Sequence, residues 1–269
     1  MQQLLDWEIQ KIQENILSRY QKYGRNLPWR KTKDPYAIHV SEVMLQQTQV
    51  ERVIPYFLKW IKKWPDYSSF AKSSRSELLG YWSGLGFNSR ALRLRESAQI
   101  IEKYWLPVDR KSWMQLPGVG PYTSSAILSF AYNEDVPVID TNIRRVLIFL
   151  FKLDESLLDK DLERFAEKLI PKGKSRDRHN ALMDYGAIEL TANKTGIRSK
   201  SKQSKFEGSD RQVRGWIVKY LLKHKKLSLV QIQENFPQKS LERLERIVVW
   251  MLDEELLWED GSFFVLDKY

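Results

Sequence analysis

Residues 116–147 have the sequence LPGVGPYTSSAILSFAYNEDVPVIDTNIRRVL, and this stretch decides the fold of the chain. Its first five residues predict a tight turn, because the two glycines can adopt backbone angles that are closed to other residues. A helix is expected to start near Tyr122, since apolar residues recur at helical spacing over 126–131. A glycine turn that leads into a helix leaves backbone N–H groups uncovered, which makes it a natural seat for a phosphate group.

The same stretch then places one acidic residue before a second helix. Residues 136–139, VPVI, lead to Asp140, and Arg144 and Arg145 follow within that helix. A phosphate-binding turn followed by a carboxylate suggests chemistry on nucleic acid. Each part also has an ordinary structural explanation, because an Asp before a helix commonly caps it.

Composition narrows the class of protein. The chain of 269 residues is too long for one typical core, so two or three domains are expected. Lys and Arg total 44 against 34 Asp and Glu, and the net charge of +10 favours a polyanionic partner. The absence of Cys excludes disulfides, thiolate metal sites and cysteine-ligated iron–sulfur clusters, and three His argue against a zinc site. Without a signal peptide or a membrane-spanning run, we expect a soluble, cytoplasmic protein.

Residues 40–50, VSEVMLQQTQV, form the second informative stretch. Glu42 lies among apolar residues of a helix predicted to open at Asp34-Pro35, and such surroundings disfavour the carboxylate and raise its pKa. A carboxyl group with a raised pKa suits a general acid at neutral pH. An ordinary Glu would instead be exposed or paired with an Arg. The adjoining QQTQ run favours the functional interpretation, because amide side chains can hydrogen-bond the edges of bases.

Helical spacing predicts further helices over 4–23, 52–64, 76–82, 91–104, 109–116, 157–169 and 177–190. Between them, Trp29 of the LPWR loop is expected to anchor that loop to the core. Phe87 follows Gly84-Leu85-Gly86 on an exposed turn, where it is either buried or a wedge that separates bases. Residues 191–208 are polar and basic, which predicts a linker or a phosphate-facing arm. The basic residues of this arm are Lys194, Arg198, Lys200, Lys202 and Lys205.

Residues 209–269 predict a separate small domain. Helices are expected over 213–222, 227–236 and 240–252, and Asp260-Gly261 predicts a two-residue hairpin turn between two short strands. Three helices followed by a hairpin match a winged helix, which is a module that binds DNA or mediates protein contacts.

Several motifs in order give the chain a family resemblance: LPWR (27–30), DPY (34–36), VSEVMLQQTQV (40–50), VIPYF (53–57), GLGF (84–87), LPGVGPYT (116–123), AILSFAY (126–132), IDTNIRRVL (139–147) and ALMDYGAI (181–188). This N-terminal part resembles the helix-hairpin-helix DNA glycosylase superfamily, and within it the MutY-type adenine glycosylases. The resemblance implies an all-α fold in which residues 1–208 form a core of two helical subdomains, with the winged-helix-like domain at 209–269.

The resemblance also implies roles for individual residues. It makes Glu42 the acid that protonates the base, and Asp140 the carboxylate that stabilises the cationic sugar, with Tyr122 and Asn142 in support. It implies DNA contacts from the hairpin Gly118-Val119-Gly120, from Gln47 and Phe87 as wedges, and from Thr48 and Arg30. The implied base pocket contains Leu45, Val50 and Asp184.

The chemistry of the residues agrees with these roles. A glycosylase must extrude the base, protonate it and stabilise a cationic sugar, so it needs one protonated and one ionised carboxyl group. Glu42 has the apolar setting of the former. Asp140 is placed at a helix N-terminus, where the helix dipole and amide hydrogen bonds favour the anion.

Three departures from the family pattern change what is expected. The four cysteines that usually hold an iron–sulfur cluster would fall near Leu190, Ile197, Lys200 and Phe206, so no cofactor and no metal are expected, and packing of Leu190, Ile197 and Phe206 must stabilise this region. The usual C-terminal domain that checks for 8-oxoguanine is replaced by the winged-helix-like segment. Residues 172–177, KGKSRD, are closer to the thymine mismatch glycosylases.

The first hypothesis is therefore a monofunctional DNA N-glycosylase of base excision repair that removes adenine mispaired with guanine or 8-oxoguanine. The second is a mismatch glycosylase that removes thymine or uracil opposite guanine, and the third is a DNA-binding adaptor that no longer cuts. The expected partner is double-stranded DNA that contains a mismatch, bound by a monomer at the nucleoid. The sequence names no protein partner and no membrane contact.

Overall fold

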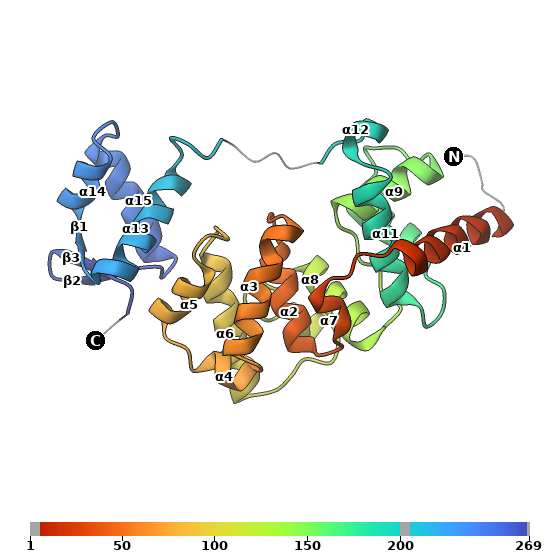
Figure 1. The fold of residues 1–269 in the computed structure, drawn as a ribbon, viewed down its shortest axis with the longest axis horizontal. Coiled ribbons are helices and arrows are strands. Elements are labelled where there is room, and N and C mark those ends of the chain that lie inside the picture. Colours follow the sequence, from red (N-terminus) through yellow and green to blue (C-terminus); the bar gives the residue numbers. More distant parts are fainter. Residues whose placement is uncertain (1–5, 200–204, 268–269) are drawn as a thin grey trace. The chain divides into compact units, whose positions relative to one another are not determined.

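The computed structural model describes residues 6–199 and 205–267, and contacts divide the chain into two compact units. Unit 1 comprises Met1–Glu42, Pro107–Gln115 and Val119–Lys202. Unit 2 comprises Val43–Leu106, Leu116–Gly118 and Gln203–Tyr269. The predicted all-α class is confirmed, because helices make up both units and a single three-stranded sheet occurs in the described part of the chain (Figure 1).

The elements before residue 200 are α1 (Asp6–Tyr23), the 3₁₀ helix η1 (Pro28–Lys31), α2 (Pro35–Leu45), α3 (Val50–Lys63), α4 (Tyr67–Ala71), α5 (Arg75–Trp82), α6 (Ser89–Lys103), α7 (Arg110–Trp113), α8 (Pro121–Ile127), the π-helix η2 (Leu128–Tyr132), α9 (Thr141–Phe151), α10 (Asp159–Glu167), α11 (Ser175–Ile188) and α12 (Ala192–Thr195). The C-terminal elements are α13 (Asp210–His224), β1 (Leu227–Ser228), α14 (Leu229–Asn235), α15 (Leu241–Asp253), β2 (Trp258–Asp260) and β3 (Phe263–Val265). Over the described residues, no helix combines the length and the apolar character that crossing a membrane requires.

Unit 1 is built on α11, which packs against both α1 and α9 (Figure 1). The apolar face predicted for residues 4–23 contributes Ile16, which joins residues of α9, α10 and α11 in one buried cluster. The first two residues of that prediction, Leu4 and Leu5, lie outside the described residues. Trp29 is buried, so its predicted role as an anchor of the LPWR segment is confirmed.

Helices α3 to α6 of unit 2 enclose an aromatic core. The ring of Trp60 lies 5.7 Å from that of Trp82 and 4.9 Å from that of Phe70, in the tilted or edge-on arrangements that aromatic pairs prefer. Both tryptophans are fully buried. The predicted helices over 52–64 and 76–82 are confirmed, while the sequence analysis missed the short helix α4, which Asp66 caps through the backbone N–H of Ser69.

The C-terminal elements α13 to β3, called the C-terminal module below, have the helix–strand–helix–helix–hairpin order of a winged helix. The predicted hairpin is confirmed, but its two-residue turn is Gly261-Ser262, one residue later than predicted, because Asp260 belongs to β2 and pairs with Phe263. The helix predicted over 227–236 is wrong at its start, because Leu227 is buried and pairs with Phe264 as strand β1. The predicted domain boundary between residues 208 and 209 stays a prediction.

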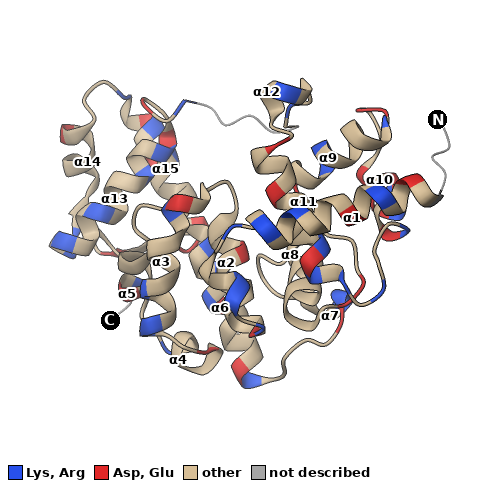
Figure 2. Ribbon diagram, turned by 45° about the vertical axis from the view of Figure 1, so that its right-hand side comes forward, with Lys and Arg blue, Asp and Glu red and all other residues tan. Residues whose placement is uncertain are grey.

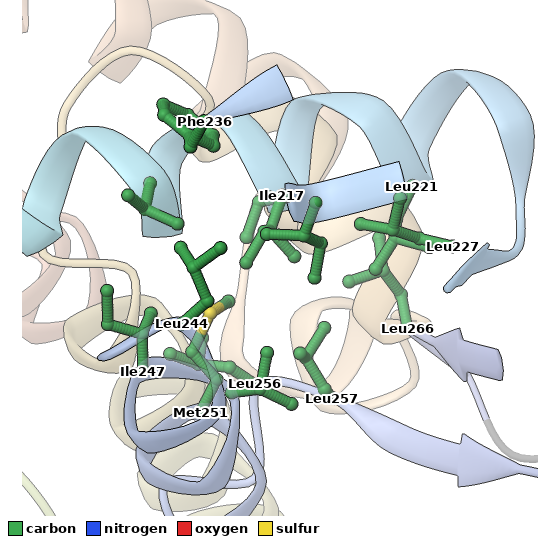
Figure 3. Close-up of a cluster of buried hydrophobic side chains, with 14 of the residues drawn as sticks. Ile217, Leu221, Leu227, Phe236, Leu244, Ile247, Met251, Leu256, Leu257 and Leu266 are labelled. Carbon is green, nitrogen blue, oxygen red and sulfur yellow. The ribbon is translucent and has the colours of Figure 1, made fainter. Parts of the chain in front are cut away.

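Burial of apolar side chains holds the C-terminal module together. Figure 3 shows buried side chains of α13, α15, β1 and the segment after β3 pointing toward one another, among them Ile217, Leu244, Leu227 and Leu266. Leu79 of α5 belongs to the same buried cluster, so the module shares its core with the helices of unit 2. This shared core places helix α13 next to helix α5.

Candidate active site

Glu42 occupies the last full turn of helix α2 and is only 4% exposed. The hydroxyl of Tyr122, in the first turn of α8, donates a hydrogen bond of 2.8 Å to its Oε2. Burial raises the pKa of Glu42 to about 7, against the lowering effect of this hydrogen bond. A carboxyl group with a pKa in this range can carry a proton at neutral pH and give it to a base.

Asp140 is the N-cap of helix α9. Its Oδ1 accepts the backbone N–H of Ile143 at 2.7 Å, and its Oδ2 accepts the side-chain amide of Asn142 at 2.9 Å. Burial nevertheless raises the pKa of Asp140, although both amide groups oppose that shift. The hydrogen bonds at the helix N-terminus favour the anion as expected, but desolvation of the carboxylate outweighs them in the direction of the shift.

Arg145 orients Asn142 and was not identified as a site residue from the sequence. Its Nη2 donates to Asn142 Oδ1 at 2.7 Å and to the carbonyl of Gly186 at 2.6 Å. Because the amide oxygen of Asn142 is used in this way, its Nδ2 donates to Asp140. The only signal in the sequence was the arginine pair that follows Asp140 by one helical turn.

His179 supports the segment that leads to Asp140. Its Nε2 accepts the backbone N–H of Val138 at 3.2 Å, so Nδ1 carries the proton and donates to the carbonyl of Ser175 at 2.7 Å. Burial lowers the pKa of His179 to about 3, which keeps the ring neutral in this arrangement. No local pattern indicated this contact, because His179 and Val138 are 41 residues apart.

Gly186 lies where helix α11 passes close to helix α9. A Cβ atom at this position would lie 2.9 Å from both the Cβ and the carbonyl oxygen of Asn142, and 3.0 Å from a methyl group of Val146. Real Cβ atoms do not come so close, so any larger residue would push α9 away and displace the Asp140–Asn142 pair.

The variant Gly186→Ala is accordingly expected to lose about 1–3 kcal/mol of unfolding free energy, the usual scale of overpacking. Base release should slow by up to ~10²-fold, because Asn142 is moved from its position. Urea denaturation and single-turnover kinetics measure the two effects. The matched control is Gly215→Ala in helix α13, where an added Cβ meets no atom within 4 Å and should leave both quantities intact or raise stability. Equal behaviour of the two variants would contradict the packing argument.

Asp184, a predicted base-pocket residue, is an ion-pair partner in unit 1. Its oxygens accept two hydrogen bonds of 2.8 Å from the guanidinium of Arg30, one of 2.6 Å from Arg25 Nε and one of 2.8 Å from the Arg25 backbone. Burial alone would raise the pKa of Asp184, but the two arginines hold it below its usual value. The side chain of Arg30 is only 9% exposed. The geometry therefore gives Arg30 a positioning role between η1 and α11, and its predicted DNA contact stays a prediction.

The two glycines of the predicted phosphate-binding hairpin differ in backbone conformation and in the space around them. Gly118 has a φ of +76°, and a Cβ there would lie 3.1 Å from the Cβ of Arg93, so both conformation and space favour glycine. Gly120 has an ordinary φ of −94°, and open space lies where its Cβ would stand. Val119 is buried, so it could contact a phosphate through its backbone but not through its side chain.

The predicted wedge residues Gln47 and Phe87 share an unusual backbone. Their φ values are +56° and +48°, in the left-handed region that residues other than glycine seldom adopt. Phe87 is 41% exposed, which confirms its predicted exposed turn. Strained backbone of this kind is found at functional sites when the surrounding structure enforces it.

Arg90 is the residue that enforces both turns, and the sequence analysis missed it. Its Nη1 donates to the carbonyls of Val43 and Gln46 at 2.6 and 2.7 Å, and its Nη2 donates to that of Gly86 at 3.1 Å. Its Nη2 also reaches Thr48 Oγ1 at 3.5 Å. One guanidinium thus joins the turn after α2 to the turn before α6. The predicted pocket residues Leu45 and Val50 lie in unit 2, whereas Asp184 lies in unit 1, so a common base pocket stays a prediction.

The residues that stand where the family usually has its four cluster-binding cysteines cannot bind an iron–sulfur cluster. Ile197 is buried, and Leu190 packs against the buried cluster of unit 1. Phe206 was expected to pack as well, which is wrong, because it is 57% exposed. Lys200 and Lys202 of the basic arm lie outside the described residues. Over the residues that are described, no three His, Cys, Asp or Glu side chains form a metal-binding group.

Comparison with known proteins agrees with this arrangement. The family model for HhH-GPD superfamily base excision DNA repair proteins matches residues 40–172. The adenine DNA glycosylase of Mycolicibacterium smegmatis is 36% identical over 230 residues, which cover 77% of this chain and 78% of that protein. The adenine DNA glycosylase of Buchnera aphidicola (subsp. Baizongia pistaciae) is 37% identical over 181 residues, which cover 65% of this chain and 52% of that protein. The chain thus spans about half the length of the Buchnera relatives it matches.

Solved structures give a second comparison. The structure of a thermostable thymine-DNA glycosylase superposes with a TM-score of 0.63 at 30% identity, over 71% of this chain and 94% of that one. The relatives found by sequence are therefore named for adenine, whereas this solved structure is named for thymine.

Proposed function

Because the chain belongs to the HhH-GPD superfamily of base excision DNA repair proteins, we propose that it is a monofunctional DNA N-glycosylase that removes adenine mispaired with guanine or 8-oxoguanine. The observation that carries the proposal is buried Glu42, whose pKa is about 7 and whose Oε2 is hydrogen-bonded to Tyr122. A carboxyl group in this state can protonate a ring nitrogen of adenine, which makes the base a good leaving group. The M. smegmatis and Buchnera relatives named as adenine DNA glycosylases support the choice of base.

The second carboxyl group would act on the sugar. As the glycosidic bond breaks, positive charge develops on the deoxyribose, and an anionic Asp140 would stabilise it electrostatically. Asn142 and the backbone of Ile143 hold the Asp140 carboxylate in one orientation, so little reorganisation is needed when the charge develops. Water then completes the hydrolysis.

Incubation of the protein with a panel of duplexes that differ in one mispair tests the proposal. Adenine release from G:A and 8-oxoguanine:A duplexes is expected, with G:T and G:U as the informative alternatives. Release from none of the four would favour the DNA-binding adaptor, which the presence of both Glu42 and Asp140 argues against.

A thymine or uracil glycosylase acting opposite guanine is the second candidate. The 30% identity to a thymine-DNA glycosylase, which spans 94% of that protein, supports it. So does the KGKSRD segment at 172–177. Excision of thymine from G:T without excision of adenine from G:A would select this candidate.

Base release is expected without strand cleavage. Strand-cleaving relatives of this family place a Lys in the second hairpin helix, where its amine forms a Schiff base with the sugar. Tyr122 stands there in this chain, and burial raises its pKa well above the usual value, so it remains a neutral phenol that cannot form such a bond. Product strands should break only after treatment with alkali or heat. Efficient trapping of a protein–DNA adduct by borohydride would contradict this expectation.

We also propose that the protein works without an iron–sulfur cluster, since the chain has no cysteine to ligate one. Purified protein with full activity should contain no stoichiometric iron by elemental analysis. Dialysis against a chelator should leave both the melting temperature and the excision rate unchanged. A loss of either quantity that added iron restores would show the opposite.

A further inference from the structure

A pocket of about 330 Å³ opens between helices α13 and α15 of the C-terminal module. Its lining residues are Asp210, Arg214, Arg243, Arg246, Ile247 and Trp250. The guanidinium of Arg214 lies 4.1 Å from the centre of the Trp250 ring, at the distance of a cation–π contact. Arg243 forms an ion pair of 2.7 Å with Asp210, the one carboxylate in the lining. The pocket therefore has excess positive charge beside the partly exposed ring of Trp250.

The positive charge continues from this pocket to the turn that carries Phe87. Arg211 precedes Arg214 by three residues, so both side chains lie on one face of α13. The guanidinium of Arg211 lies 5.9 Å from the centre of the Phe87 ring, and that of Arg90 lies 5.6 Å from it. The core shared by α5 and the module sets this placement. Arg211, Arg214, Arg246 and Trp250 are called the arginine–tryptophan surface below.

Basic and acidic residues occupy adjoining strips of helix α15. Arg243, Arg246 and Trp250 lie on the side that borders the pocket, and exposed Glu242 is the i, i+4 neighbour of Arg246 at the edge of that side. Figure 2 shows segments of both charges on this helix. Carboxylates repel phosphates, so the side of α15 with Glu245 is unsuited to DNA. The border between α13 and α15, where three arginines and one carboxylate line the pocket, is the basic edge of the module.

From these observations we infer that the arginine–tryptophan surface binds the sugar–phosphate backbone of the DNA strand beside the base pair opened by Phe87. This inference rests on the proposed function for the wedge. Guanidinium groups bind phosphate oxygens in a bidentate manner, and an aromatic ring beside them can stack on an unpaired base. A wedge opens a base pair only if the flanking strand is held, and Arg211 stands directly over the wedge. The module would thus extend the DNA interface of unit 2.

Charge reversal at two positions tests this surface in the full-length protein. The variant is Arg214→Glu with Arg246→Glu, and the matched control is Lys219→Glu with Lys223→Glu, which makes the same change in net charge. Lys223 follows Arg214 by nine residues, about 900° of helix rotation, so it lies on the opposite side of α13. Both control lysines are exposed. The ligand is a duplex with a tetrahydrofuran abasic-site analogue opposite guanine, titrated at several salt concentrations.

The reversed variant should bind this duplex at least about tenfold more weakly than the wild type at moderate salt. The slope of log K against log salt should become shallower by about 2, since each lost phosphate contact removes about 0.9. The control should change affinity by less than about threefold, because its charges lie further from the strand and are screened. Equal loss in the variant and the control would overturn the inference. The single variant Arg246→Glu, at an exposed position, should lose about half of the slope and checks that misfolding is not the cause.

Single-turnover excision at saturating enzyme separates this inference from the proposed function. The reversed variant should release the base more slowly than the control even at saturating enzyme, because the strand beside the wedge is no longer held, although the site around Glu42 is intact. If the wild type releases no base from any mismatch but the variant and control still differ in affinity, the proposed function fails while the surface remains supported. If the wild type excises adenine and the reversed variant binds as the control does, the surface is wrong and the function stands.

Discussion

Replacing Glu42 by Gln is expected to abolish adenine release from G:A duplexes while DNA binding persists. The amide has nearly the shape of the carboxyl group and can still accept the hydrogen bond of Tyr122, but it has no acidic proton to give to the base. Loss of general acid assistance should slow the reaction by at least ~10²-fold. Single-turnover excision measures the rate, and titration with a duplex that carries an abasic-site analogue measures binding. The matched control is Glu167→Gln at an exposed position of helix α10, which should behave as the wild type.

The pH dependence gives an independent check on the same residue. Only the protonated form of Glu42 can act as the acid, and its pKa is about 7, so the rate of adenine release should fall as the pH rises through that value. Thymine has no comparably basic ring nitrogen, and its release should depend less on Glu42. Cleavage of G:T but not G:A, or substantial activity in Glu42→Gln, would mean that the adenine assignment is wrong and that the thymine alternative takes its place.

Replacing Asp140 by Asn is expected to have the second large effect. The substitution keeps a residue that can cap helix α9 through the N–H of Ile143, but it removes the negative charge that would face the cationic sugar. Loss of this electrostatic stabilisation should slow base release by at least ~10²-fold. Binding of the abasic-site duplex should change little, but the melting temperature should fall somewhat, because the single oxygen of Asn cannot accept both the N–H of Ile143 and the amide of Asn142.

The acid side of the pH profile distinguishes the role of Asp140 from a merely structural one. Burial raises the pKa of Asp140, so the wild-type rate should decline toward acidic pH as this carboxylate is protonated. Together with Glu42 this gives a bell-shaped profile. In Asp140→Asn the acid limb should disappear from the residual activity while the alkaline limb stays. Retention of the acid limb would show that another group is responsible for it.

Local sequence patterns predicted most of the secondary structure. The apolar spacing of 177–190 predicted the helix found at Ser175–Ile188, and Asp260-Gly261 predicted the hairpin turn. These patterns succeed because helix periodicity, capping and turns depend on residues only a few positions apart. The errors also have local causes. The capping box of Ser228 and Gln231 marks the start of α14 at Leu229, and the predicted helix began two residues too early, at Leu227.

The raised pKa of Glu42 could likewise be predicted, because its apolar neighbours lie within one turn of the same helix. For Asp140 the sequence showed only the groups that favour the anion. Its capping hydrogen bond to Ile143 was visible in the sequence, but the extent of its burial depends on chain segments that pack around it, and burial decided the direction of the shift.

The sequence by itself determined which groups are present: a carboxyl group in an apolar helix, an acidic N-cap, a glycine hairpin and no cysteine. Only the tertiary structure decided which of them meet. It paired Asp184 with Arg30 across 154 residues, placed His179 against the backbone before Asp140, and joined two strained turns through Arg90. Such contacts are set by how helices pack, and residues far apart in the chain carry no spacing that reports their contact. The sequence therefore determined the chemistry that is possible, and packing determined the geometry in which the groups are held.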